Sequence, residues 1–286
     1  MKQINIDESS GFCWGVVQTI EKAENCLQEN KKQIYVLGEI IHNPNEIERL
    51  AKKNLITINH NQLENLDKNN SIVVIRAHGE PPATYQKINK LELELVDATC
   101  PLVKQLQNKI LQHYIDNWQI IIFGKYEHAE VIGLRGVCND ECIVILNADE
   151  ALEKIDFSKK IMLCSQTTMD VNALINIKQA IEARAVKHKF IFHNTVCKFV
   201  ISREESLKKF AKQNKLVIFV AGHYSSNGKV LFGICKSVNS NSILVENFGE
   251  IDLNILQNID TIGITGATST PKWLLEEIKN KIIRNV

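Results

Sequence analysis

Short runs of valine and isoleucine alternate along the chain with longer stretches whose apolar residues recur at three- and four-residue steps. The first pattern is typical of buried strands, and the second places apolar side chains on one face of a helix. Helical spacing is clear in residues 15–27, 101–115 and 198–213, and strand-like runs end at Gly38, Gly124 and Gly222. Strands that alternate with helices predict parallel sheets covered by helices, so we expect an α/β fold.

Three cysteines mark an internal repeat in this pattern. Cys13, Cys100 and Cys197 are 87 and 97 residues apart, and a strand-like run ending in glycine follows each at an offset of 25, 24 or 25 residues. Four residues beyond each glycine stands a polar residue, and a second strand with a polar turn follows later in each third. The polar residues at the first position are His42, His128 and Ser226, and those in the second turn are His78, Thr167 and Ser269.

This spacing predicts three small α/β units related by a pseudo-threefold repeat around a central cleft. Their expected ranges are 1–97, 98–195 and 196–286, each containing one of the three cysteines. Ligands of open α/β sheets bind beyond the carboxyl ends of the strands, and every polar turn named above follows a strand. We therefore expect the three cysteines and the polar turns to share one site.

The remaining cysteines suggest less chemistry. Cys26, Cys164 and Cys235 lie in helical or strand-like patterns and are expected to be small buried side chains. Cys138 and Cys142 could suit a metal knuckle, but no second pair of similar spacing follows, so two unrelated thiols on a loop or strand edge are favoured. No apolar run reaches the ~20 residues of a membrane span, and no signal peptide is readable, so a cytoplasmic protein is expected.

Three convergent thiolates without a fourth fit a 4Fe-4S cluster in which one iron has no protein ligand. Zinc held by three sulfurs and a water remains an alternative. Cys100 precedes Pro101, a favoured first helical residue, so its thiolate is expected at a helix N-terminus. Cys13 and Cys197 likewise precede helical patterns.

The polar turns have the composition of an anion site. Hydroxyl and amide donors gather in Ser225-Ser226-Asn227, and Thr270 is expected to cap a helix that begins at Pro271. With the histidines, these groups could hold a phosphate or diphosphate through neutral donors, which agrees with a formal net charge of +1. The same charge argues against a broad nucleic-acid surface. Glycine-rich nucleotide fingerprints are absent from the sequence.

Glu130 lies two residues after His128, where a strand-like run gives way to a helical pattern. A carboxylic acid in a dry cleft can donate a proton to a leaving hydroxyl, with Thr167 as a relay. The alternative is a solvated glutamate that opens a helix, where the helix dipole favours a negative charge.

Together these segments resemble the 4-hydroxy-3-methylbut-2-enyl diphosphate reductase family, whose enzymes catalyse the last step of non-mevalonate isoprenoid biosynthesis. The resemblance runs from residue 11 to residue 277 through GFCWGV, GEIIHNPNEIERL, RAHGEPP, DATCPLV, FGKYEHAEVIGLRG, SQTT, NTVCKF, SSNGK and TGATSTPKWLLEE. Three positions depart from the usual family pattern: Ala129 replaces a proline, Tyr224 an asparagine, and Lys198-Phe199 an Ala-Thr pair. These changes affect the expected loop conformations and the choice of electron-donor protein, not the expected reaction.

The resemblance implies a two-electron reductive dehydroxylation of (E)-4-hydroxy-3-methylbut-2-enyl diphosphate to isopentenyl and dimethylallyl diphosphates. It implies one 4Fe-4S cluster per chain held by Cys13, Cys100 and Cys197, with electrons from a ferredoxin or flavodoxin. It assigns the proton chemistry to Glu130 and Thr167, assisted by His128. The diphosphate would be bound by His42, His78, His128, Thr167, Ser225, Ser226, Asn227 and Ser269.

Two other functions remain open from the residues alone. A zinc hydrolase acting on a phosphorylated metabolite would use the same cleft, and a non-catalytic repeat module would use none of this chemistry. Iron and sulfide content separates the first alternative from the reductase. Single cysteine-to-serine variants separate the second alternative from the reductase, because they would lose the cluster in the reductase and change nothing in a non-catalytic module.

Overall fold

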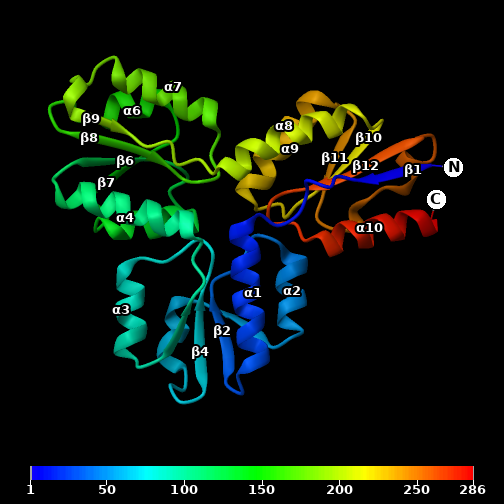
Figure 1. Ribbon diagram of the computed structural model, residues 1–286, viewed down its shortest axis with the longest axis horizontal. Coiled ribbons are helices and arrows are strands. Elements are labelled where there is room, and N and C mark those ends of the chain that lie inside the picture. Colours follow the sequence, from blue (N-terminus) through cyan, green and yellow to red (C-terminus); the bar gives the residue numbers. More distant parts are fainter. Residues whose placement is uncertain (1, 286) are drawn as a thin grey trace. The chain divides into compact units, whose positions relative to one another are not determined.

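The computed structural model describes residues 2–285, and over this range the chain forms three parallel sheets of four strands each (Figure 1). The α/β fold predicted from the alternating pattern is confirmed. The first sheet contains β2 (Gln33–Leu37), β3 (Leu55–Ile58), β4 (Ser71–Ile75) and β5 (Glu94–Asp97). The second contains β6 (Gln119–Phe123), β7 (Cys142–Ile145), β8 (Ile161–Ser165) and β9 (Phe190–Phe192). The third contains β1 (Gln3–Ile6), β10 (Leu216–Val220), β11 (Ser242–Val245) and β12 (Thr261–Gly266).

Helices connect the strands, as parallel pairing requires. The earlier ones are α1 (Trp14–Glu29), α2 (Pro44–Ala51), α3 (Pro82–Lys90), α4 (Pro101–Ile115) and α5 (Ala129–Val137). They are followed by α6 (Ala148–Lys154), α7 (Val171–Glu182), α8 (Lys198–Lys212), α9 (Ser226–Val238) and α10 (Lys272–Asn285). Within residues 2–285, no helix combines the length and apolar character needed to cross a membrane.

The three sheets share one strand order. In the first sheet the order is β3-β2-β4-β5, and in the second it is β7-β6-β8-β9, so the strand that comes first in the chain lies between the second and third. The third sheet repeats this order as β11-β10-β12-β1. Its fourth strand is therefore supplied by the start of the chain. Residues 3–6 fall in the expected range 1–97, but they pair with β12 rather than with the first sheet.

The chain divides into two compact units. One unit, here called the terminal unit, comprises the chain up to Val17, Ile41–Asn54 and the chain from Lys198 onward. The other, here called the central unit, comprises Gln18–Ile40 and Leu55–Cys197. The third sheet lies in the terminal unit, and the first and second sheets lie in the central unit. Helix α1 begins in the terminal unit and continues in the central one.

Alternate side chains of the third sheet enter two separate cores. Leu216, Ile218 and Val220 pack with α10, whereas Val217 and Phe219 pack with α8 and α9. Figure 1 shows α8 and α9 on one face of this sheet and α10 on the other. Because both faces are covered, the strand is continuously apolar rather than alternating. Each such side chain contributes roughly 1.5–3 kcal/mol to the free energy of unfolding through its burial.

In the second sheet, Ile120 and Ile122 pack with α4 and α5. This core holds α5 against the sheet, so the N-terminus of α5 lies near the carboxyl end of β6. The side chains at the start of α5 are thereby fixed at the edge where ligands of α/β sheets bind.

Candidate active site

The three repeat cysteines occupy equivalent backbone positions. A helix begins one residue after each of them: α1 after Cys13, α4 after Cys100 and α8 after Cys197. The backbone N–H of each donates to the carbonyl two residues beyond the third strand of a sheet. The acceptors are Thr268 at 3.1 Å, Ala77 at 3.0 Å and Thr167 at 2.8 Å. The repeat inferred from spacing therefore has a matching backbone geometry.

Two of these cysteines lie close together in the central unit. Both thiols are free and half-buried. The pKa of Cys100 is raised above its ordinary value, mainly by burial and further by the negative charges of Cys197 and Glu130. The N–H groups of Leu102 and Val103 at the start of α4 act in the opposite direction. If both thiols lost their protons here, the pair would need a nearby positive charge, which a metal group would supply.

Glu130 is a buried carboxyl group held by one partner residue. Its side chain lies in the first turn of α5 and is 2% exposed. The backbone N–H of Thr167 donates to one carboxyl oxygen and the Thr167 hydroxyl donates to the other, both at 2.7 Å. Burial raises the pKa of Glu130 to about 7, although both Thr167 hydrogen bonds lower it. The solvated glutamate considered as an alternative is therefore excluded by the burial.

His128 caps the helix that carries Glu130. Its Nδ1 accepts a hydrogen bond from the Glu130 backbone N–H at 3.2 Å. Because Nδ1 accepts, the proton of the neutral ring lies on Nε2, which leaves an N–H donor at the far side of the imidazole. The ring of His78 stands edge-on to it, with ring centroids 5.4 Å apart. The two histidines thus form one cluster in the central unit.

A close backbone approach brings the His78 turn onto α5. A Cβ atom at Gly136 would lie 2.4 Å from Cβ of Pro81, so this helix position has no room for a side chain. Successive contacts connect these residues. His78 lies against His128, which caps the helix of Glu130, and Glu130 is hydrogen-bonded to Thr167. The Thr167 carbonyl accepts from Cys197, whose thiol lies near that of Cys100. The backbone N–H of Cys100 in turn donates to the carbonyl of Ala77, the residue before His78. The central unit therefore brings together the predicted residues His78, Cys100, His128, Glu130, Thr167 and Cys197.

In the terminal unit, the hydroxyl and amide donors predicted as an anion site gather at the start of α9. Ser225 caps this helix, accepting from the Gly228 N–H at 3.0 Å, and its Oγ lies 3.5 Å from Oγ of Ser269. Ser225, Ser226, Asn227 and Ser269 are each no more than 9% exposed. Four polar side chains are thus collected in a nearly dry setting.

Asn227 is a buried amide in this group with one end unpaired among residues 2–285. Its Nδ2 donates to Oγ1 of Thr268 at 2.5 Å, while its Oδ1 is buried without a hydrogen-bond partner. A half-turn of the Asn227 side-chain amide exchanges the positions of its oxygen and its nitrogen. Oδ1 would then accept from the Thr268 hydroxyl, and Nδ2 would be free to donate to an anion. Thr268 was not among the residues predicted from the sequence.

His42 also lies in this group. Its carbonyl oxygen would be 2.7 Å from a Cβ atom at Gly222, so the His42 segment packs directly on the turn after β10. The neighbouring Asn43 caps α2 by accepting from the Glu46 N–H at 3.1 Å. The terminal unit therefore brings together Cys13, His42, Ser225, Ser226, Asn227 and Ser269.

The expected capping role of Thr270 is wrong. Helix α10 begins at Lys272, one residue later than expected. The Thr270 hydroxyl instead donates to the Val220 carbonyl at 2.6 Å and accepts from the Ala267 N–H at 3.2 Å. These bonds tie the turn after β12 to the end of β10. The residue fixes the shape of the Ser269 turn rather than starting the helix.

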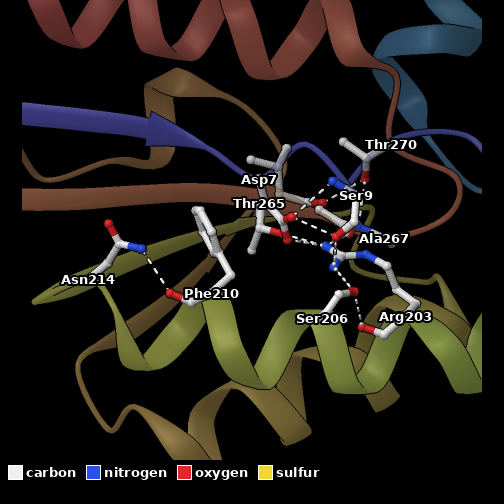
Figure 2. Close-up of polar contacts among 11 residues, drawn as sticks. Asp7, Ser9, Arg203, Ser206, Phe210, Asn214, Thr265, Ala267 and Thr270 are labelled. Carbon is white, nitrogen blue, oxygen red and sulfur yellow. Dashed lines mark hydrogen bonds and ion pairs between the residues drawn. The ribbon is translucent and has the colours of Figure 1, made fainter.

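A buried charge network holds the segment before Cys13, and the sequence did not reveal it (Figure 2). Asp7 and Arg203 form an ion pair of 2.7 Å, with side chains no more than 6% exposed. Thr265 donates to the same carboxyl group at 2.8 Å, and Ser9 lies between the two partners, 2.6 Å from Asp7 and 2.9 Å from Arg203. An isolated aspartate and an arginine in a helical pattern give no sequence signal of this pairing. The network anchors the strand-to-helix connection that presents Cys13.

Fold and site together define an α/β enzyme of three repeats that collects thiols, imidazoles and a buried carboxyl group at the ends of its strands. A family model described as "LytB protein" matches residues 4–283, and the chain belongs to that family. The family membership inferred from nine sequence segments is thus confirmed.

Similar proteins are named for one activity. A relative from Bacteroides fragilis is 46% identical over 99% of this chain and 98% of its own length. One from Chloroherpeton thalassium is 40% identical over 98% and 96%. Both are named 4-hydroxy-3-methylbut-2-enyl diphosphate reductase.

Two solved structures are similar throughout. One, of the E-1-hydroxy-2-methyl-but-2-enyl-4-diphosphate reductase from Plasmodium falciparum, is 28% identical with a TM-score of 0.87 and covers 98% of this chain and 87% of that one. The other is described as (E)-4-hydroxy-3-methyl-but-2-enyl diphosphate reductase, the terminal enzyme of the non-mevalonate pathway. It is 30% identical with a TM-score of 0.75 and covers both chains completely.

Proposed function

We propose that this chain reduces (E)-4-hydroxy-3-methylbut-2-enyl diphosphate to isopentenyl and dimethylallyl diphosphates, the last step of non-mevalonate isoprenoid synthesis. The family and the names of the similar proteins support this activity. The observation that carries the chemistry is the buried Glu130, held by Thr167 beside the cysteines. Overall, the substrate gains two electrons and two protons, its C–O bond breaks, and the hydroxyl group leaves as water.

Cys13, Cys100 and Cys197 are the residues that would hold a 4Fe-4S cluster. Such a cluster supplies single electrons and one iron without a protein ligand, which can bind the substrate hydroxyl. The half-buried thiols Cys100 and Cys197 fit this group, because metal coordination removes the proton from each thiol and offsets the charge that remains. The three equivalent backbone positions fit a cofactor bound once by each repeat.

The diphosphate would be bound by neutral donors. Ser225, Ser226, Asn227 and Ser269 offer hydroxyl and amide groups at the start of α9, where backbone N–H groups and the helix dipole also favour an anion. His42, His78 and His128 would add imidazole donors. Burial strengthens each of these hydrogen bonds, because little water competes for the anion.

The proton for the leaving hydroxyl would come from Glu130. A pKa of about 7 means that the Glu130 carboxyl group is protonated in a large fraction of the molecules at neutral pH. The proton can pass from a Glu130 oxygen to Oγ1 of Thr167, while the Thr167 hydroxyl proton moves on to the leaving oxygen. The short contact between these two groups permits this relay without movement of the backbone.

Electrons would come from a ferredoxin or flavodoxin, and the enzyme would act in the cytoplasm. Both statements rest on the resemblance to the family. They predict that the purified chain turns over with a reduced one-electron donor protein and has no requirement for direct binding of a nicotinamide.

The decisive experiment is anaerobic purification and reconstitution, followed by iron and sulfide analysis and Mössbauer spectroscopy with and without substrate. We expect about four irons per chain and one iron site whose signal changes when substrate is added. Cys13→Ser, Cys100→Ser and Cys197→Ser should each lose iron, whereas the matched change at the buried Cys235 should retain it. Stoichiometric zinc without iron would instead support the hydrolase.

A further inference from the structure

Cys138 and Cys142 form a thiol pair outside the candidate active site. Cys138 ends α5 and Cys142 begins β7, the edge strand of the second sheet. Between them Asn139 and Asp140 adopt positive φ values of 52° and 62°, and the Glu141 N–H donates to the Cys138 carbonyl at 2.8 Å. This tight turn brings the two sulfurs into hydrogen-bond contact. Cys142 lies on a strand edge, as predicted, whereas Cys138 is buried at the end of a helix and the two thiols are neighbours.

The two sulfurs have different surroundings. Cys138 is fully buried in the core of the second sheet, with its sulfur 3.2 Å from the Arg135 carbonyl oxygen and 3.7 Å from that of Leu134. Cys142 is only half-buried. One thiol is thus accessible to small molecules, and the other is shielded directly behind it.

Arg135 places a positive charge beside the accessible thiol. Its guanidinium group stacks 3.5 Å from the ring centroid of Tyr126 and forms a 2.8 Å ion pair with Asp140. The hydrogen bond from Cys138 lowers the pKa of Cys142, and the charge of Arg135 acts in the same direction against burial and the charge of Asp140. The same hydrogen bond raises the pKa of Cys138, together with burial and the Cys142 charge. Cys142 therefore has the character of an attacking thiolate.

We propose that Cys138 and Cys142 are a redox-active dithiol that low-molecular-weight disulfides convert into an intramolecular disulfide. The pair carries no metal in this proposal. Among residues 2–285, neither cysteine belongs to a group of three metal-ligating atoms within reach of one another, and the adjacent Arg135 repels a cation.

The reaction is two successive thiol–disulfide exchanges. The Cys142 thiolate attacks one sulfur of the small disulfide, so a mixed disulfide forms and the first small thiolate leaves. The Cys138 sulfur then attacks the Cys142 sulfur, its proton passes to the second leaving thiolate, and the protein disulfide closes. The two cysteines lose two electrons, and the small disulfide is reduced to two thiols.

The test uses the reconstituted enzyme in anaerobic glutathione buffers of increasing oxidised fraction. Free thiols are then blocked with N-ethylmaleimide under denaturing conditions, and the masses of the tryptic peptides are measured by mass spectrometry. Residues 136–154 form one tryptic peptide that contains both cysteines and no other. We expect this peptide to lose both N-ethylmaleimide groups together. The peptide of residues 23–31, which contains only Cys26, should remain fully blocked.

Variants separate the two roles. Cys138→Ser should accumulate glutathione on Cys142, because the second exchange cannot occur, whereas Cys142→Ser should leave Cys138 unmodified. Arg135→Met should slow the reaction several-fold. The proposal is overturned if the wild-type peptide keeps both blocking groups in oxidised glutathione alone. It is also overturned if Cys138 is the residue that acquires glutathione.

Discussion

At the scale of the residue, the state of Glu130 is decided by two opposed effects. Removal from water favours the neutral acid, and the two Thr167 hydrogen bonds favour the carboxylate. Burial prevails, since the pKa rises to about 7 despite both bonds. A carboxyl group in this state can give up a proton and regain it at neutral pH.

Glu130→Gln should retain iron and substrate binding but lose turnover by roughly 10²–10⁴-fold, because the shape remains and the proton donor is gone. Steady-state kinetics with a reduced donor protein, together with iron analysis, measures this. Glu127→Gln is the matched control, since Glu127 lies in the turn just before α5 but is exposed. Ordinary turnover in the Glu130 variant would remove this residue from the proton path.

The same carboxyl group predicts a pH dependence of stability. Because the folded-state pKa of about 7 exceeds the ordinary 4.5, the folded protein keeps a proton that the unfolded chain releases between these values. The free energy of unfolding should therefore fall by up to about 3 kcal/mol as the pH rises through this window. Urea denaturation at several pH values tests this by comparison with Glu130→Gln, in which that part of the decline should be absent. Parallel curves for the two proteins would contradict the assigned pKa.

The candidate site could be predicted largely because its residues follow strands in recognisable turns. The residues that hold the site in place could not be predicted, because they make contacts between segments far apart in the sequence. Asp7 and Arg203 meet only when β1 joins the third sheet, and nothing near either residue indicates a buried partner. Thr268 was overlooked beside Ser269, since only the fold shows that its hydroxyl meets Asn227.

At the scale of the element, α5 links the candidate site to the rest of the central unit. This nine-residue helix has His128 and Glu130 at its start and Cys138 at its end. Its position depends on Gly136, where the Pro81 ring occupies the space of a side chain. The sequence predicted a helix here, but not the close approach, which depends on a turn 55 residues earlier.

Gly136→Ala should lower the free energy of unfolding by about 1–3 kcal/mol, because its Cβ would overlap Pro81 and push α5 outward. Gly233→Ala is the matched control. Gly233 is an exposed position in α9 with no atom within 4 Å of an added Cβ, so alanine there should stabilise by about 0.5–1 kcal/mol. Chemical denaturation of both variants gives the comparison. Equal effects would mean that α5 has room to accommodate the methyl group.

At the scale of the whole chain, three repeats share one strand order, but the third is completed by β1. The spacing of cysteines predicted the repeat because one cysteine follows the fourth strand of each sheet. It could not assign residues 3–6 correctly, because a short strand of four residues does not encode its pairing partner. The expected range 1–97 therefore includes a strand of the third sheet.

Removal of the chain up to Ile6 should leave β12 as an unpaired edge and weaken the terminal unit. Hydrogen exchange should accelerate in β10 and β12, which share the damaged sheet, while β2, β4, β6 and β8 keep their protection and serve as internal controls. Unchanged protection in β12 would show that β1 adds little to this sheet.

The placement of β1 also has a consequence for synthesis on the ribosome. Gln3–Ile6 precedes both sheets of the central unit in the chain, yet its partner Thr261–Gly266 follows them. The sheets of the central unit have all their strands available much earlier. The connection that presents Cys13 therefore remains without its final support until β12 has been made, so a cluster bound by all three cysteines would mature only after both sheets of the central unit have all their strands.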